Sequence, residues 1–194
     1  TCQEFHVRLI KVVDDSVLKD ELNFIYAYEL ARLGLVNGND YKSTTKYLAT
    51  AYSIKPRNAN LQAFILENFG NTVKKMNDVD LILETINSFE KQFNFLDSNF
   101  LFNTAKANVY LELAYQNFYL MNLQKGDEYL SDCDKLRQQK EVEPYVDYVE
   151  KAYAEAASYY FKKGNYTKAK NYLKSGLVLA PNSFGLKQRL KLIP

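Results

Sequence analysis

The chain has few of the residues on which most metal and disulfide chemistry depends. Its 194 residues include one His, two Cys and no Trp. The single histidine, His6, has no cluster of further ligands around it in the sequence, so we expect no metal site. Cys2 and Cys133 lie far apart, which excludes a disulfide framework, and Cys133 is expected in the core.

Motifs of catalysis and nucleotide binding are also missing. The sequence contains no Gly-rich phosphate loop, no G-x-S-x-G and no H-E-x-x-H. Carboxylate pairs such as Asp78 and Asp80 are typical of a helix N-terminus, where they meet the positive end of the helix dipole. We therefore expect a protein that is not an enzyme and that binds no cofactor.

Long apolar runs, glycine and proline are scarce too. No run approaches the roughly 20 apolar residues that cross a bilayer, so we expect no membrane insertion. Seven Gly and four Pro suit long helices joined by short loops. Because the sequence begins at Thr1 rather than Met, we expect a processed or truncated chain, in the cytoplasm unless a removed signal segment directed its export.

The charge that is present is uneven along the chain. The net charge is +2, from 25 Lys and Arg against 23 Asp and Glu. Residues 150–194 hold nine basic and two acidic residues, a net +7, which leaves −5 for residues 1–149. The basic end could meet an acidic partner or form a solvated capping face. Its lysines are spread along helices rather than clustered, so we expect no nucleic-acid binding.

Apolar spacing predicts helices through most of the chain. Residues Ile82, Ile86, Phe89 and Phe93, at i, i+4, i+7 and i+11, are one example of a helical face. The residues 37–40, Asn-Gly-Asn-Asp, are typical of a helix stop. We predict helix pairs that begin near residues 16, 58, 98 and 143, with a linker over 137–144 and a short closing helix over 183–192.

Residues 4–13 are the exception. Their sequence, EFHVRLIKVV, partly alternates between apolar and polar residues, and this pattern favours a strand. We expect residues 1–15 to form an N-terminal extension or the tail of an upstream domain, and residues 16–194 to form the helical domain. Asp14, Asp15 and Ser16 are expected to supply N-cap chemistry for the first long helix.

The segment 150–183 carries a pattern that extends over two helices and their turn. It has an aromatic residue near the start, small residues midway, a Gly-x-aromatic turn, an Ala in the second helix and a final Pro. These places hold Tyr153, Ala156, Ala157, Gly164, Tyr166, Ala169 and Pro181. In residue types and in spacing, the segment resembles one tetratricopeptide repeat (TPR). Such a repeat cannot bury its apolar face alone, so the resemblance implies stacked neighbours.

The resemblance implies an all-α fold: a right-handed superhelix of about four antiparallel helix hairpins, a TPR-like α-solenoid, with a C-terminal capping helix. It is closest over 150–183 and less close over 26–56 and 107–136. Residues 58–95 match least, and form either a true repeat or a hairpin that only stacks. Because the predicted pairs begin 40 to 45 residues apart rather than about 34, a non-TPR repeat with longer units is the alternative.

The resemblance also implies a binding surface, because the first helix of each TPR pair lines a concave groove. The matching residues here are Asn108, Leu111, Tyr115, Phe118, Tyr119, Lys151, Ala154, Ser158, Phe161 and Lys162, with Tyr28 and Arg32 in the first pair. Tyr115 and Ser158 stand where the clamp for chaperone tails has asparagines, so that ligand is not expected.

These residues predict a protein-protein interaction scaffold, whose aromatic and partly basic groove binds a peptide or a helix of a protein partner. The alternative is a dimerisation or spacer module of a larger multidomain protein, in which the aromatic residues pack on a neighbouring repeat or on a second copy. A helical-repeat enzyme or carbohydrate-uptake component is a further alternative, for which the chain shows no site.

Overall fold

The structure, a computed structural model, describes residues 2–36 and 41–194. These residues form ten α-helices and one short 3-10 helix, with no strand among them, so the prediction of an all-α protein is confirmed for the described part of the chain. The α-helices are α1 (Cys2–Val12), α2 (Ser16–Val36), α3 (Tyr41–Ile54), α4 (Ala59–Val73), α5 (Val79–Gln92), α6 (Phe100–Tyr119), α7 (Leu123–Gln139), α8 (Val146–Lys162), α9 (Tyr166–Leu179) and α10 (Phe184–Leu192), and the 3-10 helix is Asn94–Ser98.

The chain divides into two compact units. The first comprises Thr1–Met76 and Ser88–Phe95, and the second comprises Asn77–Asn87 and Leu96–Pro194. Helix α5 is therefore shared, with its first part in the second unit and its last turn in the first. The units are described separately below.

The N-terminal segment is helical, so the predicted strand at residues 4–13 is wrong. The partly buried residues of this segment are His6, Leu9, Ile10 and Val13. Their spacing of i, i+3, i+4 and i+7 belongs to one face of a helix, whereas a strand would alternate. The His6 ring stacks on Tyr26 of α2 with 3.9 Å between ring centroids, and its Nε2 lies 3.0 Å from Asn23 Oδ1.

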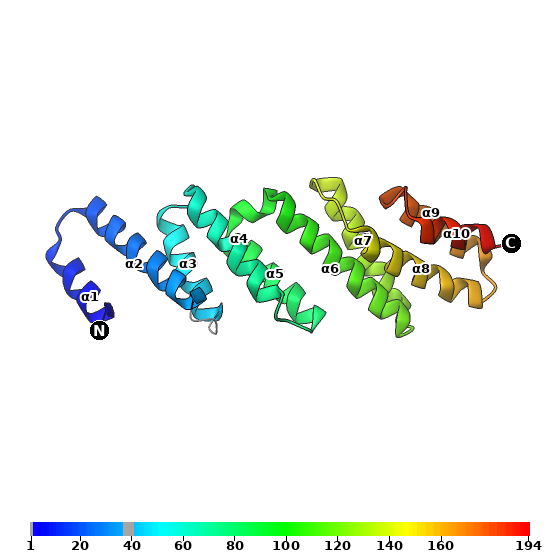
Figure 1. Cartoon of the computed structure of the whole chain (residues 1–194), viewed down its shortest axis with the longest axis horizontal. Coiled ribbons are helices and arrows are strands. Elements are labelled where there is room, and N and C mark those ends of the chain that lie inside the picture. The colour runs from blue at the N-terminus through cyan, green and yellow to red at the C-terminus, as the bar shows by residue number, and fades with distance from the viewer. Residues whose placement is uncertain (1, 37–40) are drawn as a thin grey trace. The chain divides into compact units, whose positions relative to one another are not determined.

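Helices α2 and α3 pack as a hairpin in the first unit (Figure 1). Ala27 and Ala31 of α2 are fully buried, and these small side chains allow α3 to approach closely. The predicted helix stop at residues 37–40 lies outside the described residues. Further along this unit, four aromatic rings pack in sequence with centroids 5.4 to 5.6 Å apart. They are Phe69, Phe89, Phe93 and Tyr52.

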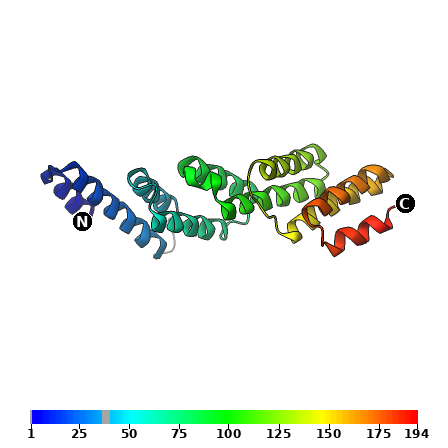
Figure 2. The ribbon, with the colours of Figure 1, turned by 90° about the horizontal axis from the view of Figure 1, so that it is seen from above.

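The second unit contains two hairpins and a final helix. Helix α6 packs on α7, α8 packs on α9, and the two hairpins meet through α6 and α8. Helix α10 then packs on α8 and α9 (Figures 1 and 2). Because α7 reverses the chain between them, α6 and α8 run in the same direction, and their C-terminal turns lie at the same end of neighbouring hairpins.

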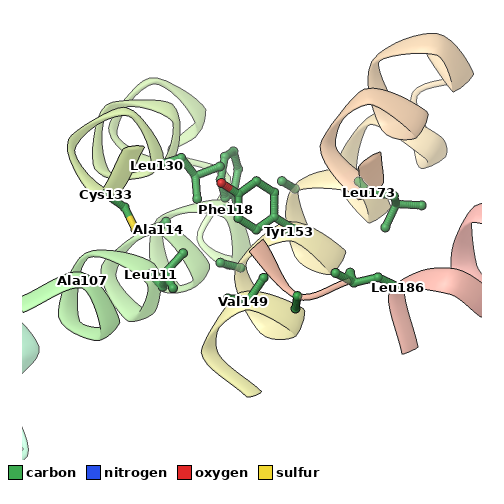
Figure 3. Close-up of a cluster of buried hydrophobic side chains, with 14 of the residues drawn as sticks. Ala107, Leu111, Ala114, Phe118, Leu130, Cys133, Val149, Tyr153, Leu173 and Leu186 are labelled. Atoms are coloured by element: carbon green, nitrogen blue, oxygen red, sulfur yellow. The ribbon is translucent and has the colours of Figure 1, made fainter. Parts of the chain in front are cut away.

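A single hydrophobic core joins helices α6 to α10 of this unit (Figure 3). The residues labelled in Figure 3 are Ala107, Leu111, Ala114 and Phe118 of α6, Leu130 and Cys133 of α7, Val149 and Tyr153 of α8, Leu173 of α9 and Leu186 of α10. Burial raises the pKa of the Cys133 thiol to about 12. The thiol therefore stays protonated at neutral pH, as expected of a core cysteine rather than a reactive one.

Small residues set how closely these helices approach. The small residues Ala114, Gly126, Ala157, Ala169 and Gly176 are all buried. A Cβ atom on Gly126 would lie 2.9 Å from the Phe118 ring, and one on Gly176 would lie 2.8 Å from Leu186. Neither position has room for a side chain without movement of its neighbour.

Short polar side chains fix where several helices begin. Asn58, Asn99 and Asn165 each accept a hydrogen bond through Oδ1 from the backbone N–H three residues later. Asp15 Oδ1 does the same for Leu18 N at 2.9 Å, as the sequence predicts. These bonds satisfy N–H groups that a helix leaves without an internal partner, so the caps define helix starts locally.

The turns that end α6 and α8 have the same backbone geometry. In both, the second residue after the helix has a left-handed backbone: Met121 with φ 62° and Gly164 with φ 75°. In both, the next N–H reaches back five residues, from Asn122 to Asn117 O at 2.7 Å and from Asn165 to Tyr160 O at 2.9 Å. Glycine adopts this backbone freely, whereas a residue with a side chain loses roughly 1–2 kcal/mol, so Met121 is strained where Gly164 is not.

Candidate functional site

Two adjoining hollows lie along α8 in the second unit. The first is open to solvent and spans about 500 Å³ together with the solvent space at its mouth. Its lining includes Ala154, Ser158 and Phe161 of α8, Leu173 of α9, and Arg189 and Leu192 of α10. The second has a volume of about 700 Å³. Its lining includes Tyr115 of α6, Glu150, Lys151 and Glu155 of α8, and Gly185 and Arg189 of α10. Ala154 and Arg189 line both hollows, which therefore form one continuous surface.

The first hollow is mainly apolar. Leu173, Leu192 and Ile193 form its lining together with Ala154 and the aromatic side chain of Phe161. Ser158 and Arg189 are its polar members. In the described part of the chain, the Arg189 guanidinium forms no ion pair. This end of the surface therefore suits an apolar group next to a negative charge.

The second hollow is more polar, but one of its two carboxylates already has a structural role. The Ser183 hydroxyl donates a hydrogen bond to Glu150. The same Ser183 Oγ caps α10 by accepting from Leu186 N at 3.1 Å. Glu150 thus fixes the start of α10 against α8, where the helix dipole favours a negative charge. Lys151, Glu155 and Arg189 remain as the charged groups that an incoming segment would meet.

The predicted groove residues divide into three groups. Tyr115, Lys151, Ala154, Ser158 and Phe161 line the two hollows. Tyr119 and Lys162 are exposed at the C-terminal ends of α6 and α8, outside the hollows, and the Tyr119 ring lies 6.2 Å from that of Tyr115. Leu111, Phe118 and Asn108 are buried.

Leu111 and Phe118 are core residues, which corrects their predicted place in the groove. Both are fully buried, and the Phe118 ring packs against Tyr172 with 5.9 Å between centroids. Helix α6 is covered by α7 on one side and by α8 on another, so its buried arc is wider than that of a helix with a single neighbour. Neither side chain can touch a partner while the fold is intact.

Asn108 acts within the fold rather than on its surface. Its Oδ1 accepts a hydrogen bond from Tyr145 N at 2.9 Å, and Thr104 Oγ1 accepts one from Glu143 N at 3.1 Å. Thr104 and Asn108 lie one turn apart on α6, so together they hold the segment that leads into α8. We call this pair of hydrogen bonds the α6 strap.

Replacing Asn108 with Ala is expected to lower the free energy of unfolding by about 1–3 kcal/mol, because the Tyr145 N–H loses its acceptor in a part-buried place. Urea unfolding measures the change. Asn171→Ala, on an exposed position of α9, is the matched control and should shift stability by less than about 0.5 kcal/mol. Equal stabilities of the two variants would contradict the role of the strap.

The sequence did not predict that α10 forms one wall of the site. We expected this helix only as a cap over the last repeat, but Gly185, Arg189 and Leu192 line the hollows. The available signal was the spacing of Leu186, Leu190 and Ile193, which places one face on α8 and α9 and leaves Arg189 at its border.

The first unit has a hollow of its own at the positions predicted there. Tyr28 and Arg32 of α2 line it together with α4 residues that include Phe64 and Glu67, and its volume is about 670 Å³. The rings of Tyr28 and Phe64 are 5.4 Å apart. Arg32 Nε is 2.7 Å from Glu29 on the same helix, an exposed ion pair that contributes little to stability.

No group of three or more His, Cys, Asp or Glu among the described residues is arranged to hold a metal ion. A helix of the length and apolarity needed to cross a bilayer does not occur in the described part of the chain. Comparison of the sequence with protein-family models and with curated proteins, and of the fold with solved structures, found no match. The functional conclusion therefore depends on the residues of the site itself.

Proposed function

We propose that this protein is an interaction scaffold and that the surface along α8 binds an extended segment or a helix of a protein partner. One observation supports this most: Tyr115, Lys151 and Phe161, from two hairpins, line hollows that adjoin through Ala154 and Arg189. An apolar hollow beside a charged one can hold a side chain and fix its direction.

We also propose that the hairpins are TPR-like repeats of a right-handed solenoid. The support comes from α6–α7 and α8–α9, which share one turn geometry. Both hairpins also place small buried residues where their helices meet, such as Ala114 and Gly126 in one and Ala157 and Ala169 in the other. In such a fold the first helices α6 and α8 supply the binding surface, which agrees with the position of the two hollows.

The proposal is tested by selecting displayed peptides on the wild-type protein and measuring their affinities in solution. Tyr115→Ala should weaken the selected peptides at least about tenfold, equal to about 1.4 kcal/mol, because an aromatic wall of the second hollow is removed. Arg189→Glu, which reverses the charge shared by the two hollows, should weaken acidic peptides most.

The matched control is Tyr145→Ala, an exposed tyrosine that lines neither hollow. It should leave the affinity unchanged, and it should melt close to the wild type, as should Arg189→Glu. Tyr115 also packs against the hydrophobic core, so the affinity of Tyr115→Ala is measured at a temperature where circular dichroism shows that the variant is folded. Selected peptides whose affinities are the same for the wild type, Tyr115→Ala and Arg189→Glu would contradict the proposal. A stable dimer in light scattering, with no peptide selected at all, would favour the dimerisation module instead.

A further inference from the structure

The turn after α6 exposes three large apolar side chains in a row. Tyr119, Leu120 and Met121 have exposed fractions of 64%, 72% and 60%. We call these three residues the α6 tip. They protrude at the end of a hairpin and line none of the hollows described above, so the proposed peptide site does not use them.

Met121 is an unexpected residue at this place. Its left-handed backbone matches that of Gly164 in the next hairpin, where the same turn is formed without strain. A methionine here lowers the stability of the fold, and because its side chain is exposed, packing contacts do little to offset this loss. Strained residues that do not stabilise the fold are typical of functional sites, such as sites that bind a ligand or another molecule.

A second exposed group lies at the same end of the next hairpin. Phe161 and Tyr166, with exposed fractions of 43% and 41%, pack with 5.4 Å between ring centroids. We call these two rings, with Lys162 and Lys163 between them in the sequence, the α8 tip. Figures 1 and 2 both show the turns after α6 and α8 at the same end of the two hairpins.

The α8 tip belongs to a segment of one charge sign. Residues 156–194 contain seven Lys and one Arg but no Asp or Glu. Lys162 and Lys163 form no ion pair within the described residues. The two tips therefore combine protruding apolar side chains with positive charge that the fold leaves unneutralised. This charge disfavours a second copy of the basic α8 tip as the occupant, and it favours a negatively charged surface.

We propose that the two tips dock the protein on the surface of an anionic lipid bilayer. Leu120 and Met121 would enter the boundary between head groups and acyl chains, and Tyr119 and Tyr166 would lie at head-group level, where aromatic rings with a polar end are favoured. Lys162 and Lys163 would meet the anionic head groups. Nucleic acid would attract the same lysines but would gain nothing from an exposed Leu and Met, so we favour lipid.

The test uses the whole chain and vesicles of phosphatidylcholine with about 30% phosphatidylserine, at low salt, because the attraction is screened by added salt. The protein should co-sediment with these vesicles, bind vesicles of pure phosphatidylcholine far less, and dissociate as NaCl is raised. Met121→Gly and Leu120→Ser should each weaken binding by roughly tenfold, which is the loss expected for one inserted apolar side chain.

Met121→Gly also separates binding from folding. Because glycine relieves the left-handed strain, this variant should melt at or above the wild-type temperature while it binds vesicles less well. Phe184→Ser is the matched control for lost apolar surface: Phe184 is 73% exposed at the N-terminus of α10, in neither tip. It should bind vesicles as the wild type does. Tyr115→Ala, which alters the second hollow, should also bind them unchanged, so vesicle binding does not depend on that hollow. Phe161 belongs both to the α8 tip and to the lining of the first hollow, so it is not used to separate the two sites.

Three results would overturn the proposal. The first is no co-sedimentation with the anionic vesicles at low salt. The second is binding that Met121→Gly and Leu120→Ser leave unchanged, which would mean attraction by lysines alone. The third is binding of single-stranded DNA that exceeds vesicle binding and is also insensitive to these two substitutions, which would assign the basic segment to nucleic acid.

Discussion

Replacing Ala169 with Glu is expected to lower the free energy of unfolding by several kcal/mol, roughly 3–5. Ala169 is fully buried on α9, within the core of the second unit. A glutamate there must bring a charge or a protonated carboxyl group into a contact that has room for one methyl group. Thermal unfolding followed by circular dichroism at 222 nm would show the loss as a large drop in melting temperature.

The control for this variant has to avoid the neighbouring lysine. Lys168 is adjacent to Ala169 in the sequence, but its Nζ donates a hydrogen bond to the Tyr160 hydroxyl at 2.7 Å and lies 4.1 Å from the centre of that ring. Asn171→Glu adds the same residue at an exposed position of α9 and should change stability by less than about 0.5 kcal/mol. Equal melting temperatures for Ala169→Glu and Asn171→Glu would show that the assigned helix faces are wrong.

Truncating Phe118 to Ala is expected to cost about 3–5 kcal/mol of stability. The ring is fully buried, contacts Tyr172 and fills the space that Gly126 leaves open. Its removal creates a cavity beside Gly126 of α7 that the surrounding helices can fill only in part. Urea unfolding would give the change from the shift in midpoint at constant slope.

Tyr119→Ala is the neighbouring control, because this side chain is exposed at the end of the same helix. Its effect on unfolding should stay within about 0.5 kcal/mol. A Phe118→Ala variant that unfolds like the wild type but fails to capture a peptide would restore Phe118 to the binding surface. The pair of variants therefore decides whether this aromatic belongs to the core or to the site.

Helix positions were predictable because their signals are local. Helices α2, α4 and α10 begin within one residue of their predicted starts. Before each of these helices a side chain accepts a hydrogen bond from the backbone N–H three residues later, and a stripe of apolar side chains follows within one or two turns. The wrong prediction of a strand at residues 4–13 has a local cause too. The partly buried face of this helix consists of His6, Leu9, Ile10 and Val13, and because His6 is polar, the sequence does not show that it belongs to the apolar face.

The residues that line the site were less predictable, because they depend on how the helices of one hairpin pack on those of the next. Nothing near Phe118 in the sequence shows that Tyr172, on α9, closes over it. The same holds for Tyr172 itself, whose hydroxyl donates a hydrogen bond to Asp127 of α7, 45 residues away. Burial raises the pKa of Tyr172 above its usual value, and this hydrogen bond is the second largest cause. Such contacts follow from packing between hairpins, which periodicity within one helix does not encode.

Hydrogen exchange at the two amides of the α6 strap can report local opening next to α8. The two donors of the strap, the N–H groups of Glu143 and Tyr145, belong to an irregular segment, yet side chains of α6 hold them. In deuterated solvent these two amides can exchange only after the strap releases, so their exchange rates measure how often the segment that leads into α8 separates from α6. Local opening of this segment thus has its own reporter, separate from global unfolding.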